Sequence, residues 1–138
     1  MTHDLRISLL ATKAAAGLAR TLAETRLYKW GLMDMSGDAL LVITELVTNA
    51  IAETPHREIR FRLARDGAGI LIAVWDSSPR PPVARPVTEP TLETLDLREE
   101  HWDDNGGWGL ALVQALSADC GCTPDPAGGK WAWARLKP

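Results

Sequence analysis

Residues 45–50 read Glu-Leu-Val-Thr-Asn-Ala, inside a stretch predicted to be a helix that starts at Ser36 and stops before Pro55. Glu45 and Asn49 stand four residues apart, so on a helix they lie one turn apart on the same face. The apolar residues of the helix form a wide stripe on the other side. An amide oxygen and a carboxylate in this arrangement suit a hard cation and the water or hydroxyl beside it. The same pair also fits a solvated helix face. The other motifs of the chain are needed to choose between these two interpretations.

Length and composition restrict the class of protein. The chain has 138 residues, which fits a single domain over residues 1–138 with a real core. Apolar residues make up 46% and charged residues 24%, as in ordinary soluble domains. The net charge of −3, without a Lys/Arg cluster, argues against nucleic-acid binding. No apolar run approaches the roughly 20 residues of a membrane helix, and the N-terminus lacks a signal-peptide pattern. We expect a cytoplasmic protein that binds neither nucleic acid nor a membrane.

Hydrophobic patterning predicts the order strand, helix, helix, strand, strand, long loop, helix, strand, strand. The expected elements are an edge strand at 5–10, helices at 12–30 and 36–54, strands at 58–64 and 70–75, a helix at 107–118, and strands near 119–123 and 130–136. The strand at 70–75 is almost continuously apolar, which predicts burial on both faces. Grouped helices and mostly antiparallel strands indicate an α+β fold, a two-layer α/β sandwich with its helices on one face of a mixed sheet.

Asp76 ends that apolar strand, just before the chain leaves the sheet. One interpretation is a polar strand terminator that caps a turn with Ser77 and Ser78. The other is a carboxylate in an apolar pocket that accepts a hydrogen bond from the exocyclic amine of adenine. Guanine carries a carbonyl at that position and would be repelled. Under this second interpretation a single acceptor selects the base.

Residues 106–110, Gly-Gly-Trp-Gly-Leu, open the third predicted helix. Gly107 and Gly109 permit close approach of a ligand to the backbone, and a helix N-terminus offers free N–H groups and a positive dipole to a phosphate. A simple hinge before the helix fits the same residues equally well. The pattern is neither a Walker loop, since no Gly-Lys-Ser/Thr follows, nor a Rossmann fingerprint, since no strand precedes it.

Together the three motifs resemble the GHKL superfamily of ATPases and kinases, over about residues 5–136. More narrowly, the chain is similar to the bacterial anti-sigma-factor serine kinases, whose domain is of the histidine-kinase-like ATPase type. The resemblance implies that Asn49 ligates Mg²⁺ and that Glu45 acts as the base. It also implies a long ATP lid at about residues 78–106.

The same resemblance assigns the remaining site residues. Asp76 matches the adenine-reading acid of the second conserved box. Gly107, Gly109 and Leu110 belong to the glycine box that follows the lid. One departure concerns residues 51–55, which are neutral to acidic where relatives carry a basic run containing histidine.

Three functions remain open at this point. The leading one is an ATP- and Mg²⁺-dependent serine/threonine protein kinase that phosphorylates an anti-anti-sigma-type partner and sequesters a sigma factor, with homodimerisation left open. The second is a nucleotide-gated protein-binding module with little or no phosphotransfer, which the altered residues 51–55 favour. The third, the severed catalytic domain of a histidine kinase, is disfavoured because the chain has no helical phosphoacceptor domain.

Overall fold

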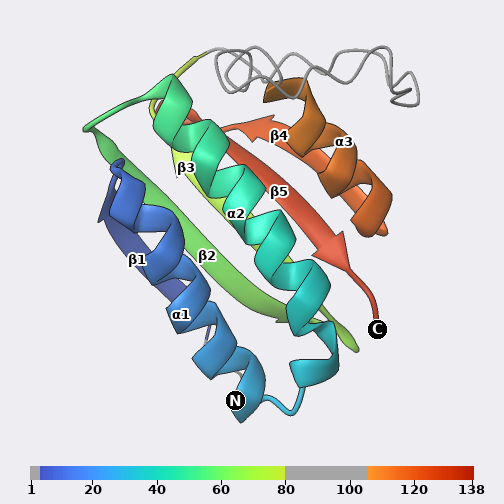
Figure 1. Cartoon of the computed structure of the whole chain (residues 1–138). Helices are drawn as coiled ribbons and strands as arrows, with labels where there is room; N and C mark the ends of the chain where they lie inside the picture. Colours follow the sequence, from blue (N-terminus) through green and yellow to red (C-terminus); the bar gives the residue numbers. More distant parts are fainter. Residues whose placement is uncertain (1–3, 80–105) are drawn as a thin grey trace, which may run out of the picture.

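The structure is a computed structural model that describes residues 4–79 and 106–138 (Figure 1). In the last helix it describes the side chains from Leu110 onward. Its elements are β1 (Leu5–Leu10), α1 (Lys13–Lys29), the 3₁₀ turn η1 (Met33–Met35), α2 (Ser36–Glu53), β2 (Glu58–Asp66), β3 (Gly69–Asp76), α3 (Gly106–Leu116), β4 (Asp119–Pro124) and β5 (Lys130–Leu136). The predicted α+β class and element order are confirmed. Almost all of the predicted lid lies outside the described residues.

The sheet has five strands in the order β1-β2-β3-β5-β4, and every neighbouring pair is antiparallel. The expected mixed sheet is therefore wholly antiparallel over the described strands. β1 is an edge strand, as predicted. The three helices cover one face of the sheet, and the other face carries no helix in the described part of the chain (Figure 1).

α2 forms the middle of the helical layer, with α1 on one flank and α3 on the other (Figure 1). Its sheet-facing side is buried and consists of Ala39, Val42, Ile43, Leu46, Val47 and Ala50. These side chains join the inward residues of the sheet, such as Phe61 and Ile72, in one core. Burial of each large aliphatic side chain contributes roughly 1.5–3 kcal/mol, so this stripe fixes the rotation of α2 about its axis.

α1 packs on the sheet with small side chains, since Ala15, Ala19 and Ala23 are buried at four-residue spacing. Gly31 ends the helix at a positive φ of 71°. The Leu32 N–H donates to the Leu27 carbonyl at 2.9 Å. This bond completes a Schellman motif and gives a hydrogen-bond donor to a carbonyl in the last turn of the helix. The chain then turns through η1 into α2.

The segment Met33–Glu53 is long and apolar enough, by length and composition, to cross a membrane. The expectation that no apolar run approaches that length was therefore too strict. Core helices pass the same test, and the apolar stripe of α2 is packed against the sheet.

β3 is less buried than its apolar run predicts. On its outward face Leu71 and Trp75 are half-buried and Ala73 between them is buried, since among the described residues helices cover the other face. Trp75 is covered instead by the Arg60 guanidinium, 4.3 Å from the ring centroid. Trp131 and Trp133 share this outward face, as their spacing predicts.

The core gives a first testable prediction. Phe61 is 1% exposed beneath the helices, so Phe61→Ala should lower the free energy of unfolding by about 3–5 kcal/mol. Urea unfolding followed by circular dichroism measures this loss. Leu10→Ala on β1, where the residue is 58% exposed, is the matched control and should change stability by less than about 0.5 kcal/mol. Equal losses in the two variants would contradict the assigned core.

Candidate functional site

Three polar residues of α2 form a row at four-residue spacing, Glu45, Asn49 and Glu53. The opposite flank of α2 lines a groove with α1 through Gly37, Leu40, Leu41 and Thr44. At 100° per residue the polar row therefore lies on the flank where α3 packs. The sequence predicted that the row lies opposite the apolar stripe. In the structure α3 lies alongside this flank of α2, so the row borders a second helix.

Glu45 and Asn49 are half-buried rather than fully solvated. Burial raises the pKa of the Glu45 carboxyl above its ordinary value of 4.5, because desolvation disfavours the charged form. Neither side chain has a hydrogen bond or ion pair within residues 4–79 and 106–138. Two partly desolvated polar groups therefore lie one helical turn apart without a polar partner among the described residues.

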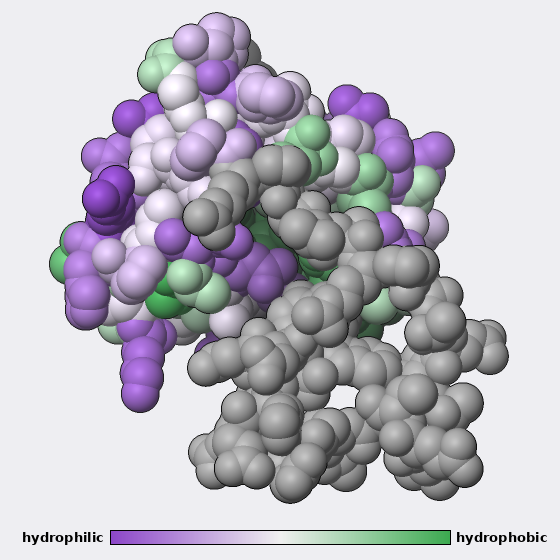
Figure 2. Space-filling view, turned by 90° about the horizontal axis from the view of Figure 1, so that it is seen from above, coloured by the Kyte–Doolittle hydropathy of each residue, from purple (hydrophilic) through white to green (hydrophobic). Residues whose placement is uncertain are grey.

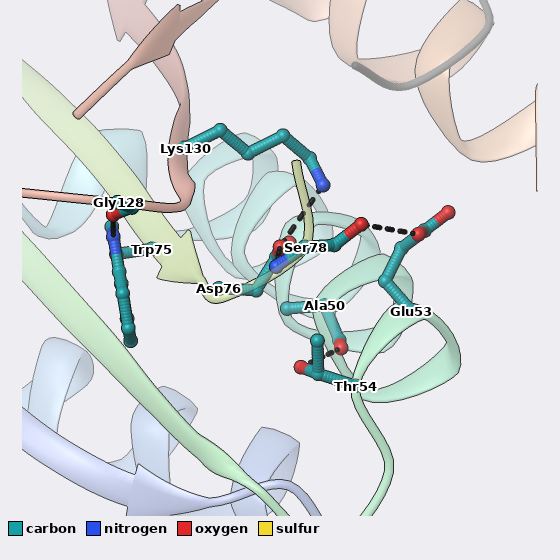
Figure 3. A network of polar contacts seen from close by, with 8 residues as sticks. All are labelled: Ala50, Glu53, Thr54, Trp75, Asp76, Ser78, Gly128 and Lys130. Atoms are coloured by element: carbon teal, nitrogen blue, oxygen red, sulfur yellow. Dashed lines mark hydrogen bonds and ion pairs between the residues drawn. The ribbon is translucent and has the colours of Figure 1, made fainter. Parts of the chain in front are cut away.

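Asp76 is the last residue of β3 and pairs in register with Lys130, the first residue of β5. Both side chains point to the helix-covered face, like Val74 and Ala132, which lie two residues along each strand. The Lys130 Nζ lies 2.9 Å from Asp76 Oδ1, and the two side chains are 6% and 5% exposed. Figure 3 shows this buried ion pair, which no sequence pattern predicted.

The turn before β5 fixes the position of this ion pair. Gly129 has a φ of 77°, and a Cβ there would lie 2.7 Å from Trp75 Nε1 and would also collide with the Asp76 carbonyl oxygen. The Trp75 indole N–H donates to the Gly128 carbonyl at 2.9 Å (Figure 3). Glycine at 129 thus lets the turn pack directly on the end of β3, which brings Lys130 beside Asp76.

The chain leaving β3 is tied to both Asp76 and α2. The Ser78 backbone N–H donates to Asp76 Oδ1 at 2.9 Å, so Asp76 does cap a turn, as its simpler interpretation predicts. The Ser78 hydroxyl donates to Glu53 Oε2 at 3.1 Å (Figure 3). The strand end and the last turn of α2, one turn beyond Asn49, are therefore in direct contact.

The glycine box lies at the same end of the molecule. Gly107 and Gly109 fall in the first turn of α3, and Leu110 is half-buried. Figure 1 shows the start of α3, the end of α2 and the end of β3 together at the top. Seen from above, the described surface shows hydrophobic residues beside hydrophilic ones at this end (Figure 2).

The polar groups at this end fit a nucleotide and a hard cation. The amide oxygen of Asn49 is an oxygen ligand of the kind Mg²⁺ takes, and Mg²⁺ commonly uses one or two protein ligands together with phosphates and waters. No group of three or more His, Cys, Asp or Glu in the described ranges forms a metal site of its own. The Ser77 hydroxyl, next to Asp76, is buried with no hydrogen-bond partner among the described residues.

The sequence matches the histidine kinase-like ATPase domain family over residues 7–135. The chain belongs to this family. The family implies a nucleotide-binding domain, and the match covers every element described above except two residues of the first strand and one of the last. A comparison with curated proteins found no match.

A solved structure shares the fold. It is the crystal structure of the RsbU and RsbW domains of Rv1364c from Mycobacterium tuberculosis, with a TM-score of 0.67 and 22% sequence identity. The similarity covers 99% of this chain and 32% of that chain, so this protein spans about a third of that structure's chain. At this identity the likeness establishes the fold alone.

Lys130 and Glu53 are neighbours of Asp76 or Asn49 to which sequence reasoning gave no role, whereas Ser78 was expected in the turn that Asp76 caps. Glu53 carries no signal beyond its closeness in sequence to Asn49. Lys130 carried one, because alternation places it on the same face as Ala132, Ala134 and Leu136, which is an apolar face. A lysine at such a position needs an acid partner.

The desolvation of Glu45 predicts a pH effect on stability. Because the folded-state pKa is raised, the folded protein binds more protons than the unfolded chain between pH 4.5 and the folded pKa, so this contribution falls as pH rises through that window. Glu45→Gln should therefore melt at a higher temperature than the wild type at pH 7. The difference should shrink as the pH is lowered toward 4.5.

Thermal melting of both proteins at a series of pH values measures this effect. Glu24→Gln, at an exposed position of α1, is the matched control and should follow the wild type at every pH. A wild type more stable than Glu45→Gln at pH 7 would show that a partner compensates the charge of Glu45.

Proposed function

We propose that this protein binds ATP with Mg²⁺ and transfers the γ-phosphate to a serine or threonine of a regulatory protein, as an anti-sigma-factor kinase of the cytoplasm. The observation that carries the proposal is the pair Glu45 and Asn49 on the α3-facing flank of α2, half-buried and without polar partners in the described part of the chain. Membership of the histidine kinase-like ATPase domain family supports the nucleotide part.

Asn49 would hold the Mg²⁺. Its amide oxygen has no hydrogen-bond donor among the described residues, so it is available as a neutral ligand. Bound Mg²⁺ would neutralise charge on the phosphates during transfer. A neutral ligand suits a site where the triphosphate already supplies the negative charge.

Glu45 would accept the proton of the attacking hydroxyl. Desolvation raises the pKa of its carboxyl above the ordinary value, which makes the carboxylate a stronger proton acceptor than a solvated glutamate. Its position one turn before Asn49 would put this base beside the cation ligand. Glu45 and Asn49 would thus act on adjacent atoms, the hydroxyl and the phosphate-bound cation.

Asp76 would read the base, and the start of α3 would receive the phosphates. The hydrogen bonds of Asp76 within the described residues fall on Oδ1, which leaves Oδ2 as an acceptor for an amine of the base. Gly107 and Gly109 put unhindered backbone N–H groups in the first turn of α3, which suits an anion. Leu110 would contribute apolar surface there.

The regulatory role rests on the resemblance and on the shared fold. The similar Mycobacterium structure contains a domain named RsbW beside one named RsbU, which supports a role in partner-protein regulation. An anti-anti-sigma-type protein would be the phosphate acceptor and a sigma factor the sequestered partner. Homodimerisation would be compatible with either role.

One observation favours the second candidate, a nucleotide-gated binding module. Glu53 places a further carboxylate one turn beyond Asn49 and bonds it to Ser78 at the end of β3. This negative charge would repel the triphosphate and would disfavour the position of the γ-phosphate that transfer needs. In that case ATP binding would control a partner surface with little phosphotransfer.

The nucleotide part is tested by calorimetry with ATP in the presence of Mg²⁺ and in excess EDTA. The wild type should bind Mg-ATP more tightly than ATP alone. Asn49→Ala should lose about tenfold in Mg-ATP affinity, the cost of one bond to a charged centre, and should become insensitive to Mg²⁺. Thr48→Ala, exposed on the adjacent position of α2, should behave as the wild type. Unchanged Mg²⁺ dependence in Asn49→Ala would remove Asn49 as the ligand.

The kinase part is tested with γ-labelled ATP and a purified anti-anti-sigma-type protein. Label should appear on an acid-stable Ser or Thr of that protein. Glu45→Gln should reduce the transfer rate by at least about a hundredfold, the usual contribution of a general base, while Mg-ATP still binds. Binding without transfer in the wild type would favour the gated binding module, and full transfer by Glu45→Gln would remove Glu45 as the base.

A further inference from the structure

Lys130 introduces a positive charge into the part of the fold where Asp76 lies. Its neighbours on the same face of β5 are Ala132, Ala134 and Leu136, all apolar. Its side chain is 6% exposed, so its ammonium is almost fully withdrawn from water. A buried ammonium needs an acid partner to offset its desolvation. The partner here is Asp76, whose Oδ1 lies 2.9 Å from Lys130 Nζ.

The ion pair leaves hydrogen-bonding capacity on both partners. An ammonium carries three N–H donors, and within the described residues Lys130 Nζ has a single polar partner, Asp76 Oδ1. The same oxygen also accepts from the Ser78 N–H, so both bonds fall on Oδ1. Oδ2 keeps its lone pairs. The pair thus offers an acceptor and a donor next to each other.

This combination changes which bases Asp76 can accept. A lone carboxylate offers acceptors alone, so it binds the amine of adenine and repels the C6 carbonyl of guanine. With an ammonium beside it, adenine would donate its amine to Oδ2 and accept from Nζ at its ring nitrogen. Guanine would accept from Nζ at its carbonyl and donate its ring N–H to Oδ2.

We propose that Lys130 determines base specificity, and that its pairing with Asp76 makes the pocket accept guanine as well as adenine nucleotides. The inference rests on the proposed nucleotide function and revises the adenine selection that Asp76 alone predicts. Lys130 acts here through a direct hydrogen bond to the base. The ion pair also leaves the reading site without net charge, which removes the electrostatic repulsion of the guanine carbonyl.

The first test needs no variant. Wild-type protein is titrated calorimetrically with Mg-ATP and with Mg-GTP, and the ratio of the two dissociation constants is the readout. Affinities within a few-fold of each other support the proposal. Binding of ATP at least about tenfold tighter than GTP, the factor expected when a buried acceptor meets a carbonyl, overturns it while leaving the nucleotide function intact. Binding of neither nucleotide overturns both.

The second test asks whether Lys130 is the residue that allows guanine nucleotides to bind. Lys130→Met keeps the length of the side chain and removes the ammonium, so it should bind ATP about tenfold or more tighter than GTP. The ratio is informative because a general loss of packing would weaken both nucleotides alike. Lys29→Met, exposed at the end of α1, is the matched control and should keep the wild-type ratio. A wild-type ratio in a folded Lys130→Met overturns the assignment.

Lys130→Met leaves Asp76 buried without a cation, and breaking a buried pair on one side is destabilising. Circular dichroism therefore precedes the titration. If this variant fails to fold, Lys130→Gln is titrated instead, because it keeps a neutral donor for Asp76 at similar length. Its weaker, uncharged donor should give a ratio shifted toward ATP, and an unshifted ratio overturns the assignment.

Discussion

The position of the candidate site depends on how α2 is held against the sheet. Its buried stripe includes Val42, Ile43 and Val47, each without measurable exposure, and its two flanks are occupied by α1 and α3. A turn of about 100° around the helix axis would move one of these side chains into solvent and would bring Glu45 into the core. Either change costs several kcal/mol. The rotation of α2 is therefore fixed, and the polar row on its flank has a single available location.

A second constraint comes from strand order. β5 inserts between β3 and β4, so the first residue of β5 lies beside the last residue of β3. This pairing joins Asp76 to Lys130 across 54 positions of sequence. Gly129 permits the close approach of the turn that precedes β5. The chemistry next to Asp76 is therefore a consequence of topology rather than of any local motif.

Local signals predicted most of the fold. The predicted order of helices and strands is found, and glycines occupy a helix end and a hairpin turn, with φ values of 71° at Gly31 and 62° at Gly67. The four-residue spacing of Glu45 and Asn49 was likewise a local property, so their shared face was predictable. Their half-buried state was not, because it depends on where α3 packs. The expected burial of β3 on both faces was met only in part, because Leu71 and Trp75 on its outward face are half-buried. An apolar run does not reveal how many layers cover a strand.

The partner of Asp76 could not be predicted, because a pair so distant in sequence depends on strand order and register. Its energetic character is also informative. A buried ion pair adds little net stability, since desolvation of both charges offsets their attraction, and an apolar pair of similar volume is often as stable. The stability of the fold therefore gives no reason for Lys130. A base that binds at this end would therefore meet an ion pair, with an acceptor and a donor side by side, rather than a lone acid.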